Sequence, residues 1–359
     1  MPVIQLEALD TLFFRDGKPF TMGEDNFAEG AFPPSPSVIY GALRTAYIAQ
    51  NLGVNGQTID DLIVDTEGLV ITNVAYQFDG NLQYPMPLDY VERKAKEHQA
   101  VCLSLVENNF SDVALPYLCV AKEHVEQVND GVLVDFQLGS YLDGNTTNVE
   151  IKKWSSFMTN EAKFGNSRNN ETRSTSDDDG NVYRVGMRLL ENKEFKQLKF
   201  IVEYQLENDI KTGLIRLGGE GKAVEMTISN FPNVKAAQLS EKHFKIVLQS
   251  PALFDNGNEP YLQWFKDKGF EVQLLTKVVG KPIKIGGWNL KDNEGKQSPK
   301  PMLSATPAGS VYYYQITNDK TVEELVNIAK THHSISDQRQ KEGFGLFKIA
   351  NLIFNPIQL

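Results

Sequence analysis

The sequence predicts an α+β fold in which one unit of strands and helices occurs twice. A helix, a glycine-rich loop and a strand follow one another over residues 207–228, and the same order returns about 125 residues later, over residues 321–349. A chain of 359 residues is also long enough for two domains of ordinary size. We therefore expect a boundary near residues 232–242, with an N-terminal domain over 1–235 and a C-terminal domain over 236–359.

The N-terminal part is predicted to begin with a strand and a helix. Residues 3–9 alternate apolar and polar side chains, as a half-buried strand does. Ser35 is a favourable N-cap, and Pro36 suits the first helical position, where no amide hydrogen is missed. Apolar residues recur after them at helical spacing, so we expect an amphipathic helix over 36–50.

The middle of the chain gives weaker signals. Residues 55–135 contain short strands and helical fragments whose order the pattern does not set. Residues 140–182 are rich in Ser, Thr, Asn, Asp and Gly, so we expect a long exposed insertion, a candidate for a mobile hairpin. Residues 183–190 and 198–206 are predicted to be paired strands of one sheet, joined by a charged turn.

The two copies of the unit share the order of their elements. The first is expected to have a short polar helix at 207–215, a loop at 217–222 and a strand at 223–228. The second is expected to open with a strand and a helix and then to repeat this order, with elements at 243–248, 260–268, 321–331 (a helix with the capping box Thr321-x-x-Glu324), 341–345 and 346–349.

Composition and charge exclude several classes of protein. The net charge of −10 argues against a free-standing, sequence-indifferent nucleic-acid binder, because such affinity comes from neutralising phosphates. No apolar run reaches the roughly 20 residues that span a bilayer, and the first residues carry no signal-type segment, so we expect a soluble, cytoplasmic protein that binds no membrane. Cys102 and Cys119 lie among apolar neighbours and are predicted to be buried, reduced thiols.

The first glycine-rich loop, Gly218-Gly219-Glu220-Gly221-Lys222, invites comparison with phosphate-binding loops. Arg216 occupies the place of the first Walker glycine and Ala223 that of the Ser or Thr, so the Walker pattern fails. The dinucleotide fingerprint also fails, because the third glycine is missing and a helix precedes the loop. A loop whose backbone amides could hold phosphate oxygens beside a lysine remains, and the alternative is an ordinary tight turn.

The second loop, Lys341-Glu342-Gly343-Phe344-Gly345, and the strand after it come close to an RNA-recognition signature of a basic residue, glycines and aromatics. The signature departs at Glu342, which replaces a basic residue. Aromatic rings on a four-stranded sheet can stack on single-stranded RNA. The alternative is a pair of buried phenylalanines on an edge strand.

Residues 277–300 carry six lysines against two acidic residues. Lys284 and Trp288 are the candidates for nucleic-acid contact in this stretch. A solvated, lysine-rich loop is the simpler interpretation.

The sequence offers little for catalysis. None of its five histidines stands at zinc or metalloprotease spacing, and no nucleophile elbow is present, so we expect no metal, no cofactor and no enzymatic activity. A general acid–base pair such as His333 with Lys341 stays open, because partners in space need not be neighbours in sequence.

Several motifs together resemble a known family. They begin with Leu9-Asp10-Thr11-Leu12-Phe13-Phe14-Arg15-Asp16-Gly17-Lys18-Pro19-Phe20 and the stretch 32–46, which starts Phe-Pro-Pro-Ser-Pro-Ser. They continue with 180–186, 217–222 and 307–312. These segments resemble the third subunits of type III-B CRISPR effectors, the Cmr complexes, within the RAMP superfamily.

The resemblance implies two ferredoxin-like (RRM-like) RAMP domains with long insertions. It further implies a non-catalytic subunit that holds the 5′ handle of crRNA and docks on the large polymerase/cyclase-type subunit at the foot of the complex. Backbone RAMP subunits would be further partners, with target RNA nearby. An acidic surface outside a local RNA groove would suit docking onto other proteins.

Mapped onto this chain, the resemblance places RNA at both glycine-rich loops, at the N-terminus of the helix 36–50, and at the insertion 140–182, which looks like a hairpin that wedges beside the crRNA. Lys222 stands where arginine is frequent, and Asp177 to Asp179 dilute the positive charge of the insertion. The full set of expected RNA-binding residues is Ser35, Ser37, Arg44, Lys163, Arg168, Arg173, Gly218, Gly219, Gly221, Lys222, Lys284, Trp288, Lys341, Gly343, Phe344 and Gly345.

Two other functions remain open at this point. One is a metal-independent endoribonuclease related to crRNA-processing RAMP proteins, with His332 or His333 as an essential residue. The other is a purely protein-binding role without RNA contact.

Overall fold

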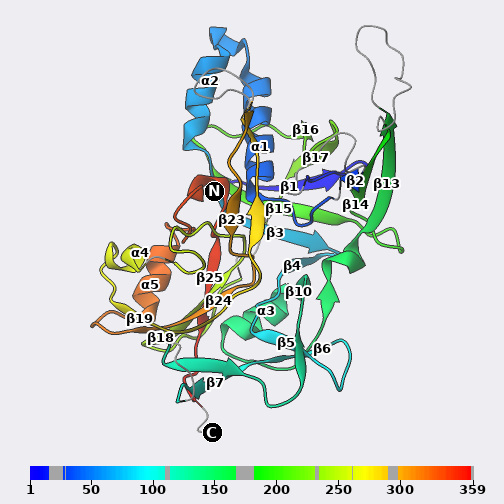
Figure 1. Ribbon diagram of the computed structural model, residues 1–359. Coiled ribbons are helices and arrows are strands. Elements are labelled where there is room, and N and C mark those ends of the chain that lie inside the picture. Colours follow the sequence, from blue (N-terminus) through cyan, green and yellow to red (C-terminus); the bar gives the residue numbers. More distant parts are fainter. Residues whose placement is uncertain are drawn as a thin grey trace. The chain divides into compact units, whose positions relative to one another are not determined.

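The computed structural model describes residues 1–15, 27–28, 30–109, 114–166, 182–230, 234–260, 262–289 and 298–356 (Figure 1). The chain divides into two compact units, each built from three separate stretches. Unit 1 comprises Met1–Val70, Ser155–Ser229 and Lys284–Ser304, and unit 2 comprises Ile71–Trp154, Asn230–Ile283 and Ala305–Leu359. The division of the duplicated pattern at residues 235 and 236 stays a prediction.

Unit 1 contains four strands that adjoin in the order β15 (Leu198–Gln205), β1 (Val3–Ala8), β17 (Ala223–Ile228) and β16 (Gly213–Arg216). Strand β1 is antiparallel to both of its neighbours, with Leu6 opposite Phe200 and Met226. All three of these side chains are buried, which is the expected result of an alternating strand packed on a core. The predicted strands at 3–9 and 223–228 are confirmed.

Two helices follow in unit 1, α1 (Pro36–Asn51) and α2 (Ile59–Asp65). Helix α1 buries Ile39, Leu43 and Tyr47, which lie at helical spacing, and so confirms the helix predicted over 36–50. Short 3-10 turns at Val54–Gly56 and Thr66–Gly68 flank α2. Unit 1 also contains the short pair β21 (Trp288–Asn289) and β22 (Ser298–Pro299). Strands β20 (Ile283–Ile285) and β23 (Leu303–Ala305) pair where the chain passes between the units.

The predicted pairing of strands 183–190 and 198–206 is wrong. Strand β14 (Val182–Leu189) lies between β13 (Thr159–Asn166) and the two-residue strand β2 (Phe27–Ala28), whereas β15 pairs with β1. Only a bridge between Glu191 and Gln197 joins the ends of β14 and β15. Alternation identified both strands, but the choice of partner depends on residues far away in the sequence.

The polar insertion is shorter than expected. Strands β13 and β14 form an antiparallel hairpin from the Thr159–Leu189 pair to the Asn166–Val182 pair, and residues 167–181 lie outside the described residues. Residues 140–157 are not exposed as a whole, because Tyr141, Trp154 and Phe157 are buried. Large aromatic side chains in a polar stretch were the signal that this part belongs to the core.

The predicted helix at 207–215 is also wrong. This stretch is a loop followed by β16. The Tyr204 hydroxyl accepts a hydrogen bond from the Ile210 amide (3.2 Å), and Gln50 Oε1 accepts one from the Lys211 amide (2.9 Å). These tertiary acceptors replace the carbonyls that a helix would supply.

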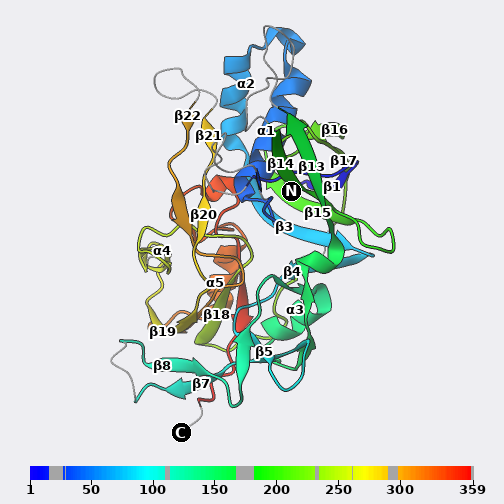
Figure 2. The ribbon, with the colours of Figure 1, turned by 45° about the vertical axis from the view of Figure 1, so that its right-hand side comes forward.

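Unit 2 contains a sheet in the order β19 (Val272–Val278), β24 (Val311–Ile316), β18 (His243–Leu248) and β25 (Phe347–Asn351), with α4 (Gln263–Lys266) and α5 (Val322–Ala329) beside it (Figure 2). Along the chain the elements run strand, helix, strand, strand, helix, strand, and all neighbouring strands are antiparallel. Each helix thus connects two parallel strands that are separated in the sheet by one other strand. The predicted strand at 243–248 is confirmed, and the helix expected at 260–268 is present in shortened form.

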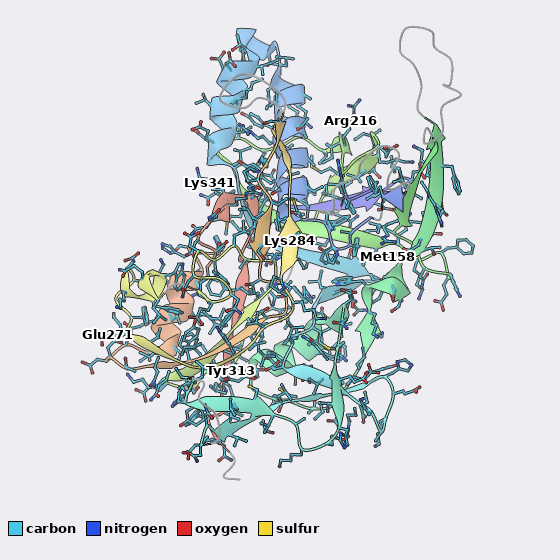
Figure 3. The ribbon with its side chains drawn as sticks, in the orientation of Figure 1. Met158, Arg216, Glu271, Lys284, Tyr313 and Lys341 are labelled. Atoms are coloured by element: carbon cyan, nitrogen blue, oxygen red, sulfur yellow. The ribbon has the colours of Figure 1, made fainter. Side chains whose placement is uncertain are left out.

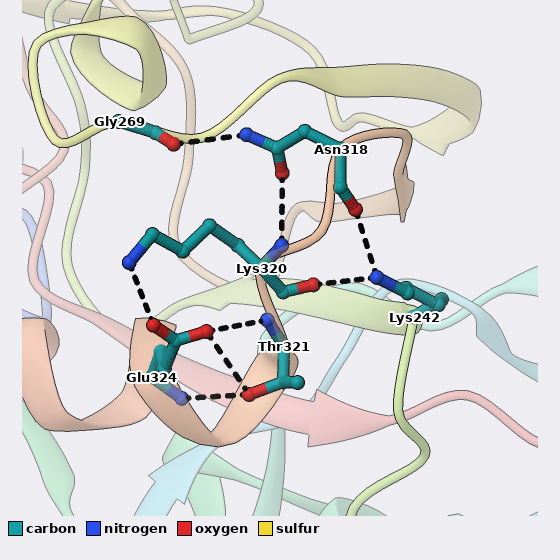
Figure 4. Close-up of polar contacts among 6 residues, drawn as sticks. All are labelled: Lys242, Gly269, Asn318, Lys320, Thr321 and Glu324. Carbon is teal, nitrogen blue, oxygen red and sulfur yellow. Dashed lines mark hydrogen bonds and ion pairs between the residues drawn. The ribbon is translucent and has the colours of Figure 1, made fainter.

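The N-terminus of α5 is fixed by the predicted capping box (Figure 4). The Thr321 hydroxyl accepts from the Glu324 amide (3.3 Å), while Glu324 Oε2 accepts from the Thr321 amide (2.9 Å). Lys320 adds an ion pair with Glu324, which together with the hydrogen bonds lowers the pKa of that carboxyl. Lys242 Nζ donates to the carbonyls of Asn318 and Lys320, so β18 is tied to the same turn.

The remainder of unit 2 comes from residues 71–154, the part whose order the sequence did not indicate. Strands β12, β10, β4 and β3 adjoin in that order, strands β11, β6, β5 and β9 form a second sheet, and β7 pairs with β8. The bounds are β3 Val70–Phe78, β4 Asn81–Pro85, β5 Tyr90–Arg93, β6 Gln99–Cys102, β7 Ser104–Glu107, β8 Tyr117–Val120, β9 Val125–Gln127, β10 Gly131–Val134, α3 Asp135–Leu142, β11 Val149–Glu150 and β12 Lys152–Lys153.

A buried ion pair joins these strands to the four-stranded sheet of unit 2. Lys245 Nζ on β18 lies 3.0 Å from Asp89 Oδ2, and the two side chains are 5% and 0% exposed. The hydroxyls of Tyr141 on α3 and Tyr313 on β24 donate to the same carboxylate oxygen, at 2.7 and 2.6 Å (Tyr313 is labelled in Figure 3). Burial alone would lower the pKa of Lys245, but the Asp89 carboxylate more than offsets this, so the pKa lies above its usual value. Three elements, β18, β24 and α3, are therefore held by one carboxylate in the turn before β5.

The two cysteines lie close to this cluster and are not bonded to each other. Burial raises the pKa of Cys102 well above its usual value and that of Cys119 to about 12, so both are protonated thiols at neutral pH. Both residues are half-buried rather than fully buried as predicted, and their reduced state stays a prediction.

Removing the Asp89 carboxylate should destabilise unit 2 strongly. We expect Asp89→Asn to cost about 3–5 kcal/mol in the free energy of unfolding, because it leaves the Lys245 charge buried without a partner. Tyr313→Phe, which removes one hydrogen bond to a charged group, should cost about 1.5–3 kcal/mol. Urea unfolding of the three proteins measures both costs. An Asp89→Asn protein as stable as the parent would show that the ion pair does not hold the unit together.

Candidate nucleic-acid interface

Phe13 and Phe14, which follow β1, bring three predicted RNA-facing segments of unit 1 together. The Phe13 carbonyl accepts a hydrogen bond from the Gly219 amide (2.8 Å), and the Phe14 carbonyl accepts one from the Ala31 amide (2.7 Å). The Phe13 side chain packs on Val185 and Met187 of β14. The first glycine-rich loop, the approach to α1 and the β13–β14 hairpin therefore meet at two consecutive residues.

Phe14 also fixes the chain that leads into α1. Its ring lies 6.4 Å from that of Phe32 and 6.1 Å from that of Phe200, centroid to centroid. Phe200 belongs to β15 and is fully buried, so this aromatic group anchors the surface segments to the core of unit 1.

The first glycine-rich loop is the turn between β16 and β17. The Leu217 amide donates to the Lys222 carbonyl (3.0 Å), which closes the turn. Gly218 has φ +78°, and a Cβ there would lie 2.5 Å from the Phe13 carbonyl oxygen. Only glycine permits both this backbone conformation and this close approach. The loop is thus a tight turn, which was the alternative prediction, and it packs against the backbone of Phe13.

Both lysines of this surface are paired with carboxylates. Lys163 Nζ on β13 lies 3.0 Å from Glu220 Oε2 in the glycine-rich loop, so the hairpin and the loop are linked directly. Lys222 forms an ion pair with Asp10. The Lys222 hydrogen bond, together with one from the Thr11 amide, holds the pKa of Asp10 below its usual value. A phosphate that binds either lysine has to compete with a carboxylate already in place.

The hairpin carries an exposed aromatic–cation pair that sequence reasoning missed. Phe164 on β13 lies directly opposite Arg184 on β14, and the Arg184 guanidinium carbon is 5.8 Å from the centre of the Phe164 ring. Phe164 is 69% exposed, which leaves a large part of the ring open to solvent. The sequence signal for this pair was that Phe164 follows Lys163 in a polar stretch, which has too few apolar residues to bury the ring. Arg216 is a second missed residue, exposed at the end of β16 beside the glycine-rich loop (Figure 3).

The N-terminus of α1 is less available than expected. Ser35 occupies the N-cap position, but its side chain makes no capping hydrogen bond, and within the described residues its buried hydroxyl has no partner. Arg44 is half-buried and donates from Nε to the Thr66 hydroxyl (2.9 Å) and from one terminal nitrogen to the Ile63 carbonyl (3.5 Å). These hydrogen bonds direct Arg44 towards the end of α2, and its contact with a phosphate stays a prediction. Ser37 lies in the first turn of α1 and is half-buried.

The second glycine-rich loop, in unit 2, is packed into its own core. Phe344 is completely buried, so its ring presents no face on which a base could stack. Gly345 has φ +66°, and a Cβ there would lie 2.5 Å from the Ser336 amide nitrogen. The carbonyls of Gly343 and Phe344 accept hydrogen bonds from the Ser250 and Ser334 hydroxyls. The buried-phenylalanine alternative is correct for Phe344, and Lys341 alone is exposed at the start of the loop.

The remaining expected contacts are scattered or lie outside the described residues. Lys284 is exposed on β20, and Trp288 begins β21. Lys277, from the same lysine-rich stretch, is neutralised by Glu259 at 2.7 Å. Arg168 and Arg173 are outside the described residues.

Nowhere in the described part of the chain do three His, Cys, Asp or Glu side chains gather so as to hold a metal ion. His332 is exposed, and its Nδ1 lies within hydrogen-bonding distance of the Thr331 hydroxyl (3.0 Å) and the Ile328 carbonyl (3.3 Å). None of the helices in the described ranges has the length and apolar character needed to cross a bilayer.

Comparison with known proteins gives one family. The model of a family described as CRISPR-associated protein (Cas_Cmr3) matches residues 4–352, nearly the whole chain. No protein of curated function matches the chain.

Solved structures resemble the chain over almost its full length. A chain of the type III-B Cmr-beta complex bound to cognate target RNA shares 15% sequence identity, covers 97% of this chain and 99% of its own, and has a TM-score of 0.50. A chain of the same type of complex bound to cognate target RNA and AMPPnP has 14% identity, 96% and 98% coverage and a TM-score of 0.49. A chain of the Csm3–Csm4 subcomplex in the type III-A CRISPR-Cas interference complex has 14% identity, 99% and 100% coverage and a TM-score of 0.39. At such identity, the first of these likenesses shows a shared fold.

Gly218→Ala should destabilise unit 1 more than Gly221→Ala. Both glycines have positive φ, so both substitutions should cost about 1–3 kcal/mol in backbone strain, but only the Cβ at position 218 meets a backbone oxygen. Urea unfolding followed by tryptophan fluorescence measures the difference. Equal costs would mean that the contact with Phe13 is easily relaxed and does not hold the loop.

Glu220→Gln should strengthen the binding of single-stranded RNA. The substitution removes the carboxylate that competes for Lys163, and exposed ion pairs of this kind are worth up to about 1 kcal/mol, or about fivefold in affinity. Fluorescence anisotropy with a labelled RNA, at low and high salt, measures the effect. Glu225→Gln, an exposed glutamate on β17, is the matched control for net charge. Weaker binding by Glu220→Gln would show that Glu220 orients Lys163 rather than competing for it.

Proposed function

Because the chain belongs to the Cas_Cmr3 family of CRISPR-associated proteins, we propose that it is a non-catalytic subunit of a type III CRISPR effector that binds the 5′ handle of crRNA. The family match agrees with the resemblance carried by the N-terminal motifs. One observation supports RNA binding most directly. The glycine-rich loop, the β13–β14 hairpin and the approach to α1 meet at Phe13 and Phe14 and bring Lys163, Lys222 and exposed loop backbone to one surface.

This surface has the chemical groups that single-stranded RNA requires. Lysines that exchange a carboxylate for a phosphate supply charge, and the Phe164 ring offers a platform for a base. Arg184 and Arg216 add guanidinium groups, which bind phosphates in a bidentate way. We assign the handle to this surface of unit 1 rather than to the Gly343–Gly345 loop, whose only aromatic ring is buried.

The proposed architecture is a pair of ferredoxin-like, RRM-like domains. The sheet of β18, β19, β24 and β25 with helices α4 and α5 follows that order of elements in full. The earlier series β1, α1, β3, β15 and β17 follows it without the second helix, since residues 207–212 form a loop. The mixed fold, mostly strands in antiparallel sheets, agrees with this proposal.

We further propose that the subunit docks on the large polymerase/cyclase-type subunit and on backbone RAMP subunits, with target RNA nearby. The net charge of −10 favours this arrangement, because a protein that binds RNA only within an assembly needs a small basic surface and leaves the remainder for protein partners. For the cleavage alternative, the contacts of His332 are local: its Nδ1 lies near the Thr331 hydroxyl and the Ile328 carbonyl, just beyond α5.

The test is RNA binding by the chain together with the large subunit. A labelled crRNA with an intact or scrambled 5′ handle would be titrated across a salt series. We expect a preference for the intact handle, and we expect Lys222→Ala and Phe164→Ala each to weaken binding about tenfold, the scale of one lost stacking or charged contact. Phe195→Ala, an 83% exposed aromatic in the β14–β15 turn, and Lys193→Ala are the matched controls.

Three outcomes would overturn the proposal. Equal binding of the intact and scrambled handles would leave only non-specific phosphate contact. Unchanged crRNA retention in Lys222→Ala, Phe164→Ala and Arg44→Ala would favour a purely protein-binding role. RNA cleavage in EDTA that disappears in His332→Ala or His333→Ala would establish the endoribonuclease instead.

A further inference from the structure

The hairpin of α1 and α2 in unit 1 exposes apolar side chains that neither the core nor the RNA-binding surface uses. Helix α2 packs on α1, and in both ribbon views the two helices extend away from β1, β15 and β17 of the same unit (Figures 1 and 2). At the connection and along α2 the exposed fractions are high: Leu52 52%, Val54 45%, Ile59 53%, Ile63 37% and Val64 63%. We call these five residues the hairpin tip. Single exposed apolar residues are ordinary, but five in thirteen consecutive positions form a group.

The tip is a fixed surface rather than a frayed helix end. Leu62 is completely buried and anchors α2 on α1, while the Thr58–Asp61 capping box fixes the first turn. Arg44 ties α1 to the end of α2 through the Ile63 carbonyl and the Thr66 hydroxyl. Ile59 and Ile63 are four residues apart, so they lie on one face of the helix, and Asp60 and Val64 continue that face on one side.

The charged side chains of α2, and of the residues next to it in sequence, are all acidic. No Lys, Arg or His occurs between Arg44 and Arg93, whereas Asp60, Asp61, Asp65 and Glu67 lie on or next to α2. Asp61 is engaged in the capping box, and Asp65 accepts a hydrogen bond from Gln57 (3.0 Å). In the described part of the chain the exposed Asp60 carboxylate makes no ion pair. Asp60 follows Ile59 directly and lies one helical turn before Val64, so its charge stands beside the exposed apolar side chains.

The exposed apolar side chains and the acidic residues together limit which kind of partner can bind the hairpin tip. An RNA strand or an anionic lipid surface would be repelled by the carboxylates. A second copy of the chain, docked symmetrically, would place the acidic group opposite itself, and like charges at an interface are costly. A protein surface that joins apolar side chains to a lysine or arginine satisfies both requirements.

We propose that the hairpin tip is a protein-docking surface whose partner presents apolar residues and a basic side chain that pairs with Asp60. The proposal rests on the proposed function only in placing that partner among the protein subunits of the effector. It assigns docking to an element of unit 1 separate from the Lys163, Phe164 and Lys222 surface.

The experiment uses the reconstituted effector. A photo-crosslinking amino acid is placed at Val64, or at Ile228 as the control, an 81% exposed apolar position on β17 of the same unit. We expect the Val64 probe to crosslink one protein subunit, at a peptide that contains a lysine or arginine, and the Ile228 probe not to reach that peptide. Asp60→Lys should lower the crosslink yield and the affinity for that subunit about tenfold, and Asp60→Asn should have a smaller effect.

The controls separate this proposal from RNA binding. Thermal unfolding of each variant establishes that it is folded, and handle binding of the chain with the large subunit is measured on the same proteins. Loss of the crosslink with handle binding intact supports the docking surface, whereas loss of handle preference with the crosslink intact overturns only the proposed function. Crosslinks from Val64 to RNA or to a second copy, the absence of any crosslink, or full affinity in Asp60→Lys would overturn the docking surface.

Discussion

The contact of the Gly218–Gly219 turn with the Phe13 carbonyl is the constraint on which the proposed RNA surface depends. The Phe13 carbonyl, in the segment that follows β1, accepts a hydrogen bond from the Gly219 amide, and the space for this approach exists only because Gly218 has no side chain. The next residue, Phe14, holds the segment before α1 and packs on Phe200 of the core. Loop, hairpin and helix approach are thereby positioned by one short segment, and its rigidity comes from the sheet below it.

On the proposed RNA surface, a phosphate would bind by displacing a carboxylate from a lysine rather than through an excess of positive charge. Lys163 and Lys222 are each paired with a carboxylate, so an acidic protein can present them without a broad positive field. Such an arrangement would disfavour binding to any polyanion. Affinity would depend on the positions of the phosphates, because each phosphate has to take the place of a carboxylate beside a lysine. The buried Lys245–Asp89 pair is different, since two tyrosine hydroxyls donate to the same Asp89 oxygen inside unit 2 and its role is structural.

Sequence reasoning succeeded where the signal is local. The helix α1, with Pro36 in its first turn, the strands β1, β17 and β18, and the Thr321–Glu324 capping box follow from residues within a few positions of one another. It failed where partners are distant. Residues 207–212 form no helix, because the side chains of Tyr204 and Gln50 accept hydrogen bonds from the backbone amides of Ile210 and Lys211. Strands β14 and β15 belong to different sheets. Phe344 is buried by elements that are distant in the sequence.

The sequence by itself determined the family, through motifs that lie along nearly the whole chain, and it identified the glycine-rich loop and Lys163 as candidates. Only the tertiary structure decided that these two belong to one surface, because the Lys163–Glu220 pair joins residues 57 positions apart and the Lys222–Asp10 pair residues 212 apart. It also added Phe164 with Arg184 and removed Phe344 as a stacking platform. Helix caps and the alternation of apolar and polar residues involve only a few neighbouring residues, so they can be predicted from the sequence. Ion pairs and the burial of aromatic rings depend on the tertiary fold of the whole chain.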